Sequence, residues 1–313
     1  IDSKSSLSVS DLFQQVEAVE VEAATKPLSP ESTVALYNDY IEAVFTTRGG
    51  AIQTVSFLQT KSGERDDYVF NKGGLLPALS LSLNSADGEI REFDLDYRIE
   101  QQSSDSVTFV LDGGEGLSIR RHYRIASTGS VDEPYTIEHS TTFKNNSGSA
   151  KALSTIYFNL GTARPITEEM IGVNFLNVGY FDGEDAEFIP IKKLTGGKGF
   201  LGIGASNPKD VIAEAARIEW SSVKNQFFAS VLSSGTVANN VFVYPVEAPS
   251  DVINQPGRLG ISGSVGYELG TLTAGESKSL DFQYFVGPKE FKRLQSMGNE
   301  QDLVMQFGFL GFF

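Results

Sequence analysis

The stretch Ile-Glu-Ala-Val-Phe-Thr-Thr-Arg-Gly-Gly-Ala-Ile at residues 41–52 consists of two apolar runs on either side of Arg48-Gly49-Gly50. Short apolar runs bounded by glycine are typical of β-strands. Because no long helices separate such runs, the sequence favours a large antiparallel sandwich over a parallel α/β sheet. The pattern predicts strands at residues 41–47, 51–60, 79–83, 90–99, 107–111, 117–125, 135–144, 151–160, 227–232, 240–246, 267–273 and 280–286.

The composition limits the classes of function. The chain has 313 residues, enough for one large β domain or two ordinary ones whose core needs no disulfide. Forty acidic residues against 25 basic ones give a net charge of −15, which argues against nucleic acid or anionic lipid as a main partner. No cysteine is present, so the sequence has neither disulfides nor thiolate metal ligands.

Three regions differ in composition. Residues 1–32 are acidic and rich in serine, which is typical of a flexible linker. Residues 33–286 carry the strand pattern and form the predicted β domain. Residues 287–313 begin with Gly287-Pro288, which places a proline at a first helical position and predicts a short C-terminal helical region.

The C-terminal region is the candidate functional surface. Its apolar stripe fits either packing against the β domain or contact with a partner or a membrane. Under the second interpretation the chain is a segment of a longer, membrane-attached protein, and deletion of residues 303–313 is expected to leave the β domain stable. The predicted contact residues are Phe291, Leu294, Phe307, Phe309, Leu310, Phe312 and Phe313.

Motifs that would carry chemistry are scarce. Residues 197–202 match the spacing G-x-G-x-x-G, but Gly204 and Pro208 follow too closely for the helix that a dinucleotide site needs. His122 lies between Arg120 and Arg124 on the predicted solvent face of its strand. His139 is expected to be a buried structural residue. The sequence has no familiar metal-binding or nucleophile motif. We therefore predict no cofactor, no metal site and no catalytic residue.

Three stretches, in order along residues 33–313, resemble the large periplasmic domain of YidC-type membrane protein insertases. They are residues 41–52, residues 219–228 (Glu-Trp-Ser-Ser-Val-Lys-Asn-Gln-Phe-Phe), and residues 284–289 together with the aromatic tail. The resemblance implies a galactose-mutarotase-like β-supersandwich followed by a short helical region near the membrane. It also implies a membrane helix before residue 1 and a second one after the tail.

The same resemblance implies a function. The segment would lie on the periplasmic side of a bacterial inner membrane, as part of an insertase and chaperone that assists the insertion and folding of membrane proteins. Its role would be non-catalytic positioning and docking, because in the family the insertase machinery belongs to the membrane helices. The implied partners are Sec translocon components and nascent membrane proteins, and the membrane would be reached through the flanking helices.

A second resemblance supplies an alternative. Residues 154–161 (Ser-Thr-Ile-Tyr-Phe-Asn-Leu-Gly) are similar to a stretch of aldose 1-epimerases, which are built on a similar sandwich. In that family a catalytic histidine lies two residues before the tyrosine, whereas this chain has Thr155, which cannot do the proton transfer. The alternative function is therefore a carbohydrate-binding or aldose-epimerase-like sandwich. A surface adhesin module is a third hypothesis, which rests on composition alone.

Overall fold

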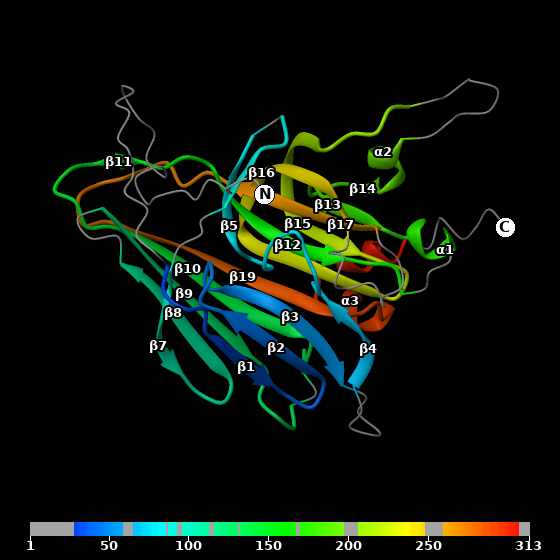
Figure 1. The fold of residues 1–313 in the computed structure, drawn as a ribbon, viewed down its shortest axis with the longest axis horizontal. Helices are drawn as coiled ribbons and strands as arrows, with labels where there is room; N and C mark the ends of the chain where they lie inside the picture. Colours follow the sequence, from blue (N-terminus) through cyan, green and yellow to red (C-terminus); the bar gives the residue numbers. More distant parts are fainter. Residues whose placement is uncertain are drawn as a thin grey trace.

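The computed structural model describes residues 28–58, 65–85, 87–92, 96–112, 116–130, 132–166, 170–196, 206–247 and 259–306. In these residues a small antiparallel sheet packs against a much larger one (Figure 1). The predicted fold class, a large antiparallel sandwich with a short C-terminal helical region, is confirmed. The small sheet has the order β1-β2-β3-β4 and is made of β1 (Thr33–Tyr37), β2 (Ile41–Thr46), β3 (Ala51–Leu58) and β4 (Arg65–Phe70).

The large sheet has 13 strands among the described residues, and every pairing in it is antiparallel. In the order β6-β5-β12-β17-β16-β19-β10-β9-β8-β7 its strands are β6 (Ile90–Glu92), β5 (Leu81–Asn84), β12 (Ile156–Ala163), β17 (Leu259–Tyr267), β16 (Phe228–Glu247), β19 (Ser277–Pro288), β10 (Thr136–Asn145), β9 (Leu117–Ile125), β8 (Ser106–Asp112) and β7 (Arg98–Gln102). Off this path, β15 (Ile212–Lys224) pairs with β16 and with β13 (Asn177–Phe181), which pairs with β14 (Ala186–Pro190). A separate ladder joins β11 (Lys151–Ala152) to β18 (Thr271–Leu272).

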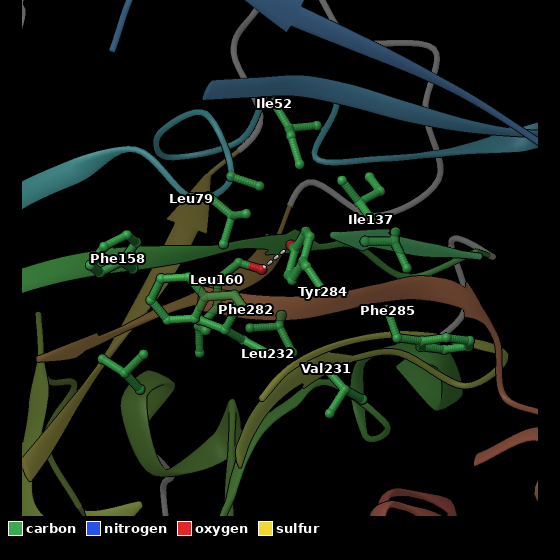
Figure 2. Packing of buried hydrophobic residues seen from close by; sticks show 14 of the residues in the cluster. Ile52, Leu79, Ile137, Phe158, Leu160, Val231, Leu232, Phe282, Tyr284 and Phe285 are labelled. Carbon is green, nitrogen blue, oxygen red and sulfur yellow. Dashed lines mark hydrogen bonds between the residues drawn. The ribbon is translucent and has the colours of Figure 1, made fainter. Parts of the chain in front are cut away.

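The main core lies between the two sheets. Figure 2 shows Ile52 and Leu79 on one side of it and Ile137 and Tyr284 facing them from the large sheet. The phenol of Tyr284 donates a hydrogen bond of 2.7 Å to the carbonyl oxygen of Leu160, so the polar atom of this buried ring is satisfied. Burial alternates along β9 as the period of two predicts, with every odd-numbered position buried.

The glycine turn at residues 48–50 is inserted into this core. Gly50 has φ +54°, and a Cβ atom there would lie 3.0 Å from the ring of Tyr97 and 3.1 Å from Phe109. The carbonyl oxygen of Gly50 accepts a hydrogen bond of 2.8 Å from the phenol of Tyr123 on β9. A side chain at this position would therefore be strained in backbone conformation and would also collide with the large sheet.

Arg121 on β9 is unusual in this core because its side chain is fully buried. Its Nη1 donates to the carbonyl oxygen of Gly49 at 2.7 Å, and its Nη2 donates to the carbonyl oxygen of Leu79. Its Nε lies 3.3 Å from Thr141 Oγ1, and no carboxylate in the described part of the chain pairs with it. The guanidinium thus ties the β2–β3 turn and the segment before β5 to the large sheet through backbone carbonyls.

Several predicted strands have different bounds in the structure. The predicted strand at residues 90–99 is wrong, because β6 and β7 occupy opposite ends of the sheet order. The predicted strand at 151–160 is divided into β11 and β12, which belong to different sheets. Conversely, the two strands predicted at 227–232 and 240–246 are one strand, β16, which pairs with β19 in its first part and with β17 in its last. The change of neighbour along one strand is what the local pattern failed to reveal.

Residues 259–266 of β17 lie outside every predicted strand, and the sequence of β17, Leu-Gly-Ile-Ser-Gly-Ser-Val-Gly-Tyr, contains three glycines. Its glycines are explained by close packing across the sheet. A Cβ atom at Gly263 would lie 3.1 Å from Val178, and one at Gly266 would lie 2.7 Å from the ring of Tyr157. Glycine inside a strand commonly marks such a close approach of neighbouring groups. The predicted strand at residues 267–273 is correspondingly wrong, because β17 ends at Tyr267.

The short helices are grouped at one end of the sandwich, on the right in Figure 1. They are α1 (Met170–Val173), α2 (Lys192–Thr195), α3 (Phe291–Ser296) and the 3-10 helix η3 (Gln301–Met305). Within the described ranges no helix has the length and apolar character needed to cross a bilayer. We call the end that carries α2, α3, η3 and the β15–β16 turn at residues 225–227 the helical end.

Candidate functional site

Residues 287–306, here called the C-terminal segment, are held against the sandwich by side chains of neighbouring strands. Trp220 Nε1, on β15, donates to the carbonyl oxygen of Asn299 at 2.8 Å. Lys224 Nζ, at the end of the same strand, donates to the carbonyl oxygen of Val304. On β13, Asn177 Nδ2 donates to Gln306 Oε1 at 3.2 Å. Because two of these bonds reach the backbone of the segment, they fix the path of the chain as well as its contacts.

Apolar packing supports the same docking. Leu294 of α3 and Val304 of η3 have no exposed surface and belong to the main core. Between the two helices, Gly298, Asn299 and Glu300 all have positive φ values, from +49° to +75°. Left-handed conformations are uncommon outside glycine, so the reversal between α3 and η3 needs contacts that hold it. The bond from Trp220 to Asn299 is one such contact.

Lys224 lies in an environment that disfavours its charge. Its side chain is 2% exposed, and its Nζ is 4.8 Å from the centroid of the Phe188 ring. Burial, together with the nearby cation of Lys289, lowers the pKa of Lys224 from 10.5 to about 6. Burial also lowers the pKa of Lys289 to about 8. At neutral pH Lys224 is therefore largely uncharged and acts as a neutral donor to the segment.

The predicted contact residues fall into three groups. Phe291 is 37% exposed at the start of α3, as a contact surface requires. Leu294 is buried, so it holds α3 against the domain instead of facing outward. The remaining predicted residues, Phe307, Phe309, Leu310, Phe312 and Phe313, lie outside the described residues, as do residues 1–27 of the predicted linker and the glycine loop at 197–202.

The buried positions of the C-terminal segment contradict the expectation that residues 303–313 are dispensable for stability. Deleting 303–313 removes Val304 from the core and leaves the amine of Lys224 without its acceptor. Burial of one valine contributes about 1.5–3 kcal/mol, and a buried donor without a partner costs about 1–3 kcal/mol. We expect the melting temperature to fall by roughly 10 °C. Deletion of 307–313 alone is the control and should lower it much less; equal losses would contradict the assignment.

Comparison with known proteins places the chain in a family. The family model described as the YidC periplasmic domain matches residues 33–313. The chain belongs to the YidC periplasmic domain family. A curated relative, the membrane protein insertase YidC of Chlorobaculum tepidum, is 21% identical over 295 residues, which cover 91% of this chain and 46% of that protein. The chain thus spans about half the length of the curated relative that it matches.

The chain is also similar to solved structures. A galactose mutarotase related enzyme from Lactobacillus acidophilus superposes with a TM-score of 0.50 at 11% identity, covering 82% of this chain and 97% of that one. A putative aldose 1-epimerase from Escherichia coli K12 gives a TM-score of 0.49 at 12% identity, covering 83% and 100%. At this level of identity the first similarity shows the sandwich fold alone, and the predicted galactose-mutarotase-like architecture is confirmed.

In this YidC periplasmic domain, two of the stretches that carry the resemblance meet in space. Residues 219–228 contain the turn of the β15–β16 hairpin. Phe228, the first residue of β16, is paired with Pro288 of β19. Lys289 N donates to the carbonyl oxygen of Phe227 at 2.7 Å. Trp220 and Lys224 from the hairpin then hold the C-terminal segment that follows β19. Sequence reasoning singled out both stretches but could not show that the first is the support of the second.

Tyr157 belongs to the stretch that is similar to aldose 1-epimerases. The face of the sheet on which it lies is covered by aromatic side chains of the domain itself. Tyr157, Phe242 and Tyr244 form a second buried cluster, and the rings of Tyr157 and Phe242 meet edge to face at 5.1 Å. The phenol of Tyr244 accepts a hydrogen bond of 3.1 Å from Asn84 Nδ2. Burial raises the pKa of both tyrosines, so their phenols remain protonated at neutral pH. These aromatic residues therefore contribute to packing, and neither tyrosine is ionised so that it could accept a proton.

The two histidines lie where the strand pattern predicts. His139 is buried, its Nδ1 donates to the carbonyl oxygen of His122 at 2.9 Å, and its Nε2 accepts from Thr141 Oγ1 at 2.7 Å. Burial, followed by the charge of Arg121, holds the pKa of His139 well below its usual value. His122 is partly exposed on the opposite face, and burial followed by Arg120 lowers its pKa as well. His139 is thus a neutral structural residue of the core.

Proposed function

We propose that this chain is the periplasmic domain of an inner-membrane protein insertase and that it works without catalysis, by positioning and docking. The observation that carries the proposal is the attachment of the C-terminal segment to β15 by Trp220 and Lys224. A segment fixed in this way gives whatever follows it a defined direction relative to the sandwich. Membership of the YidC periplasmic domain family supports the link to membrane protein insertion.

The proposed division of the chain is a linker at residues 1–32, the sandwich at 33–286 and a junction at 287–313. The proposed location is the periplasmic side of a bacterial inner membrane, with membrane helices on both flanks. Sec translocon components and nascent membrane proteins are the proposed partners. These assignments follow the family, of which the curated insertase relative is about twice as long as this chain.

Within the junction we propose two kinds of residue. Phe291 and the tail residues Phe307, Phe309, Leu310, Phe312 and Phe313 face the membrane surface. Leu294 acts from inside the domain, since it is buried and anchors the helix that carries Phe291. The junction thereby sets the angle between the sandwich and the bilayer.

Charged substitutions in the tail of the full-length parent protein test this function. For Phe309→Asp/Phe312→Asp we expect insertion of a client protein, measured by protease protection in membrane vesicles, to fall about tenfold. The reason is that an aspartate costs up to roughly 2.5–3.5 kcal/mol when it enters the apolar part of a membrane. Tyr37→Asp is the matched control, because Tyr37 is an exposed aromatic residue on β1 of the small sheet. Insertion at the wild-type level by the double variant would show that the tail has only a packing role.

A further inference from the structure

Exposed apolar side chains are concentrated at the helical end. Phe227, Phe291 and Leu303 are 51%, 37% and 37% exposed, and they are three of the five large apolar residues that are exposed in the described part of the chain. The other two, Leu28 and Tyr37, lie before and at the end of β1. Single exposed apolar residues are ordinary on a protein surface, whereas a group at one end indicates contact with an apolar partner.

Hydrogen bonds join the segments that carry these three residues, although the segments come from different parts of the sequence. The bond from Lys289 N to the carbonyl oxygen of Phe227 places the hairpin tip two residues from Phe291. The bond from Lys224 Nζ to Val304 places the same hairpin next to Leu303. Phe227 was not among the contact residues predicted from the C-terminal region, since it lies 60 residues earlier in the chain.

Basic residues are also present in the elements of the helical end. Pro190 at the end of β14 is paired with Asn177, whose side chain bonds Gln306, so Lys192 and Lys193 of α2 follow closely on the same end. The stretches 192–195, 206–210 and 287–306 together contain six basic and four acidic residues, although the whole chain has a net charge of −15. Lys192, Lys193 and Lys292 are exposed. The net charge of the whole chain argues against anionic lipid as a partner. These three stretches, however, carry two more basic than acidic residues.

We propose that the helical end is a membrane-contact surface for an anionic bilayer. Phe227, Phe291 and Leu303 enter the boundary between headgroups and acyl chains, and Lys192, Lys193 and Lys292 meet the lipid phosphates. Aromatic and basic residues in this combination are typical of interfacial binding. The inference rests on the proposed function and extends its contact surface to the β15–β16 hairpin and to α2.

Two features favour lipid over a second copy of the chain as the occupant. The surface is continuous with the C-terminal segment, which leads directly into the apolar sequence of residues 307–313. A dimer through this face would also bring two sets of like charges together. The acidic remainder of the domain is repelled by an anionic bilayer, so the contact would fix a single orientation.

The absence of cysteine from the chain permits a direct test with single labels. Phe227→Cys, Phe309→Cys and Tyr37→Cys are made in the chain of residues 1–313 and labelled with an environment-sensitive nitrobenzoxadiazole dye. They are mixed with vesicles of phosphatidylglycerol and phosphatidylcholine. We expect blue-shifted, brighter emission at positions 227 and 309 that lipid nitroxides quench, and no change at position 37.

The charge contribution is tested by the affinity for the same vesicles. Lys192→Glu/Lys292→Glu should bind roughly tenfold more weakly, because each basic residue near an anionic surface contributes measurably to binding. Lys144→Glu/Lys151→Glu, which makes the same change of charge on β10 and β11, should bind as the wild type does. Equal weakening by both pairs would show a non-specific effect of net charge and would overturn the proposal.

The outcomes separate the inference from the function on which it rests. A response at position 309 but not at 227 would overturn the wider contact surface and leave the proposed junction intact. A response at 227 that depends on protein concentration without vesicles would identify a second copy of the chain as the occupant and would also overturn it. No response at either position would overturn the inference, while the insertion assay would still decide the proposed function separately.

Discussion

Replacement of Lys224 by methionine is expected to remove about 1.4 kcal/mol per pH unit from the pH dependence of the free energy of unfolding between pH 6.5 and 9.5. The pKa of Lys224 is lowered from 10.5 to about 6 in the folded domain, so in this window the unfolded chain binds a proton that the folded chain does not. Stability then rises with pH and is lost as the pH falls toward 6. Denaturant titrations at several pH values measure the slope directly.

Two controls define this experiment. Lys144→Met removes an exposed lysine from β10 and should leave the slope unchanged. In Lys224→Met a weaker slope should persist, because Lys289, with a pKa of about 8, still contributes above that pH. At pH 6.5 the variant should be more stable than the wild type, since it no longer carries the cost of a buried amine. A slope equal to that of the wild type would show that Lys224 remains charged in the folded domain.

Arg121→Ala is expected to destabilise the domain by about 4 kcal/mol or more, which is among the largest effects of a single substitution. The change leaves the carbonyl oxygens of Gly49 and Leu79 without their donor and opens a cavity between the two sheets. Each unsatisfied buried acceptor costs roughly 1–3 kcal/mol, and the cavity adds to this cost. Chemical denaturation followed by the fluorescence of buried Trp220 provides the measurement.

The neighbouring arginine is the matched control. Arg120 is exposed on the other face of β9, where it forms an ion pair with Glu100, and such pairs contribute about 0–1 kcal/mol. Arg120→Ala should therefore be close to neutral. Arg121→Met, which keeps most of the volume, separates the lost hydrogen bonds from the cavity and should be intermediate. If the alanine variants at 120 and 121 were equally stable, the guanidinium of Arg121 would not be the link between the sheets.

Local pattern was sufficient for the fold class and for the long, alternating strands. Residues 117–125 were predicted with the bounds that β9 has, because a period of two over nine residues leaves little ambiguity. The same alternation places position 121 on the inner face, yet the partners that make a buried arginine tolerable there are carbonyls from residues 49 and 79. Such partners are distant in sequence, so no local pattern reveals them.

The candidate site was predictable in its parts but not in its assembly. The apolar stripe at Phe291 and Leu294 indicated a surface helix with a buried side, and the structure shows which residue takes which role. Trp220 and Lys224 were recognised as part of a resemblance, but their function as supports depends on β15 and the C-terminal segment being neighbours in space. Exposure of Phe227 depends on the hairpin turn and has no signature in the sequence.

The position of β19 in the sheet gives the domain unequal mechanical strength at its two ends. β19 pairs with β10 at residues 277–285 and with β16 at residues 282–288, and the C-terminal segment begins with its last two residues. A pull along the chain at residue 306 would act on two hydrogen-bonded ladders in shear, in which many bonds share the force. β1, the first described strand, lies at the edge of the small sheet and is paired on one side only. A force applied to that strand can break its hydrogen bonds one after another. We therefore expect the N-terminal strand to detach at a lower force than the C-terminal one.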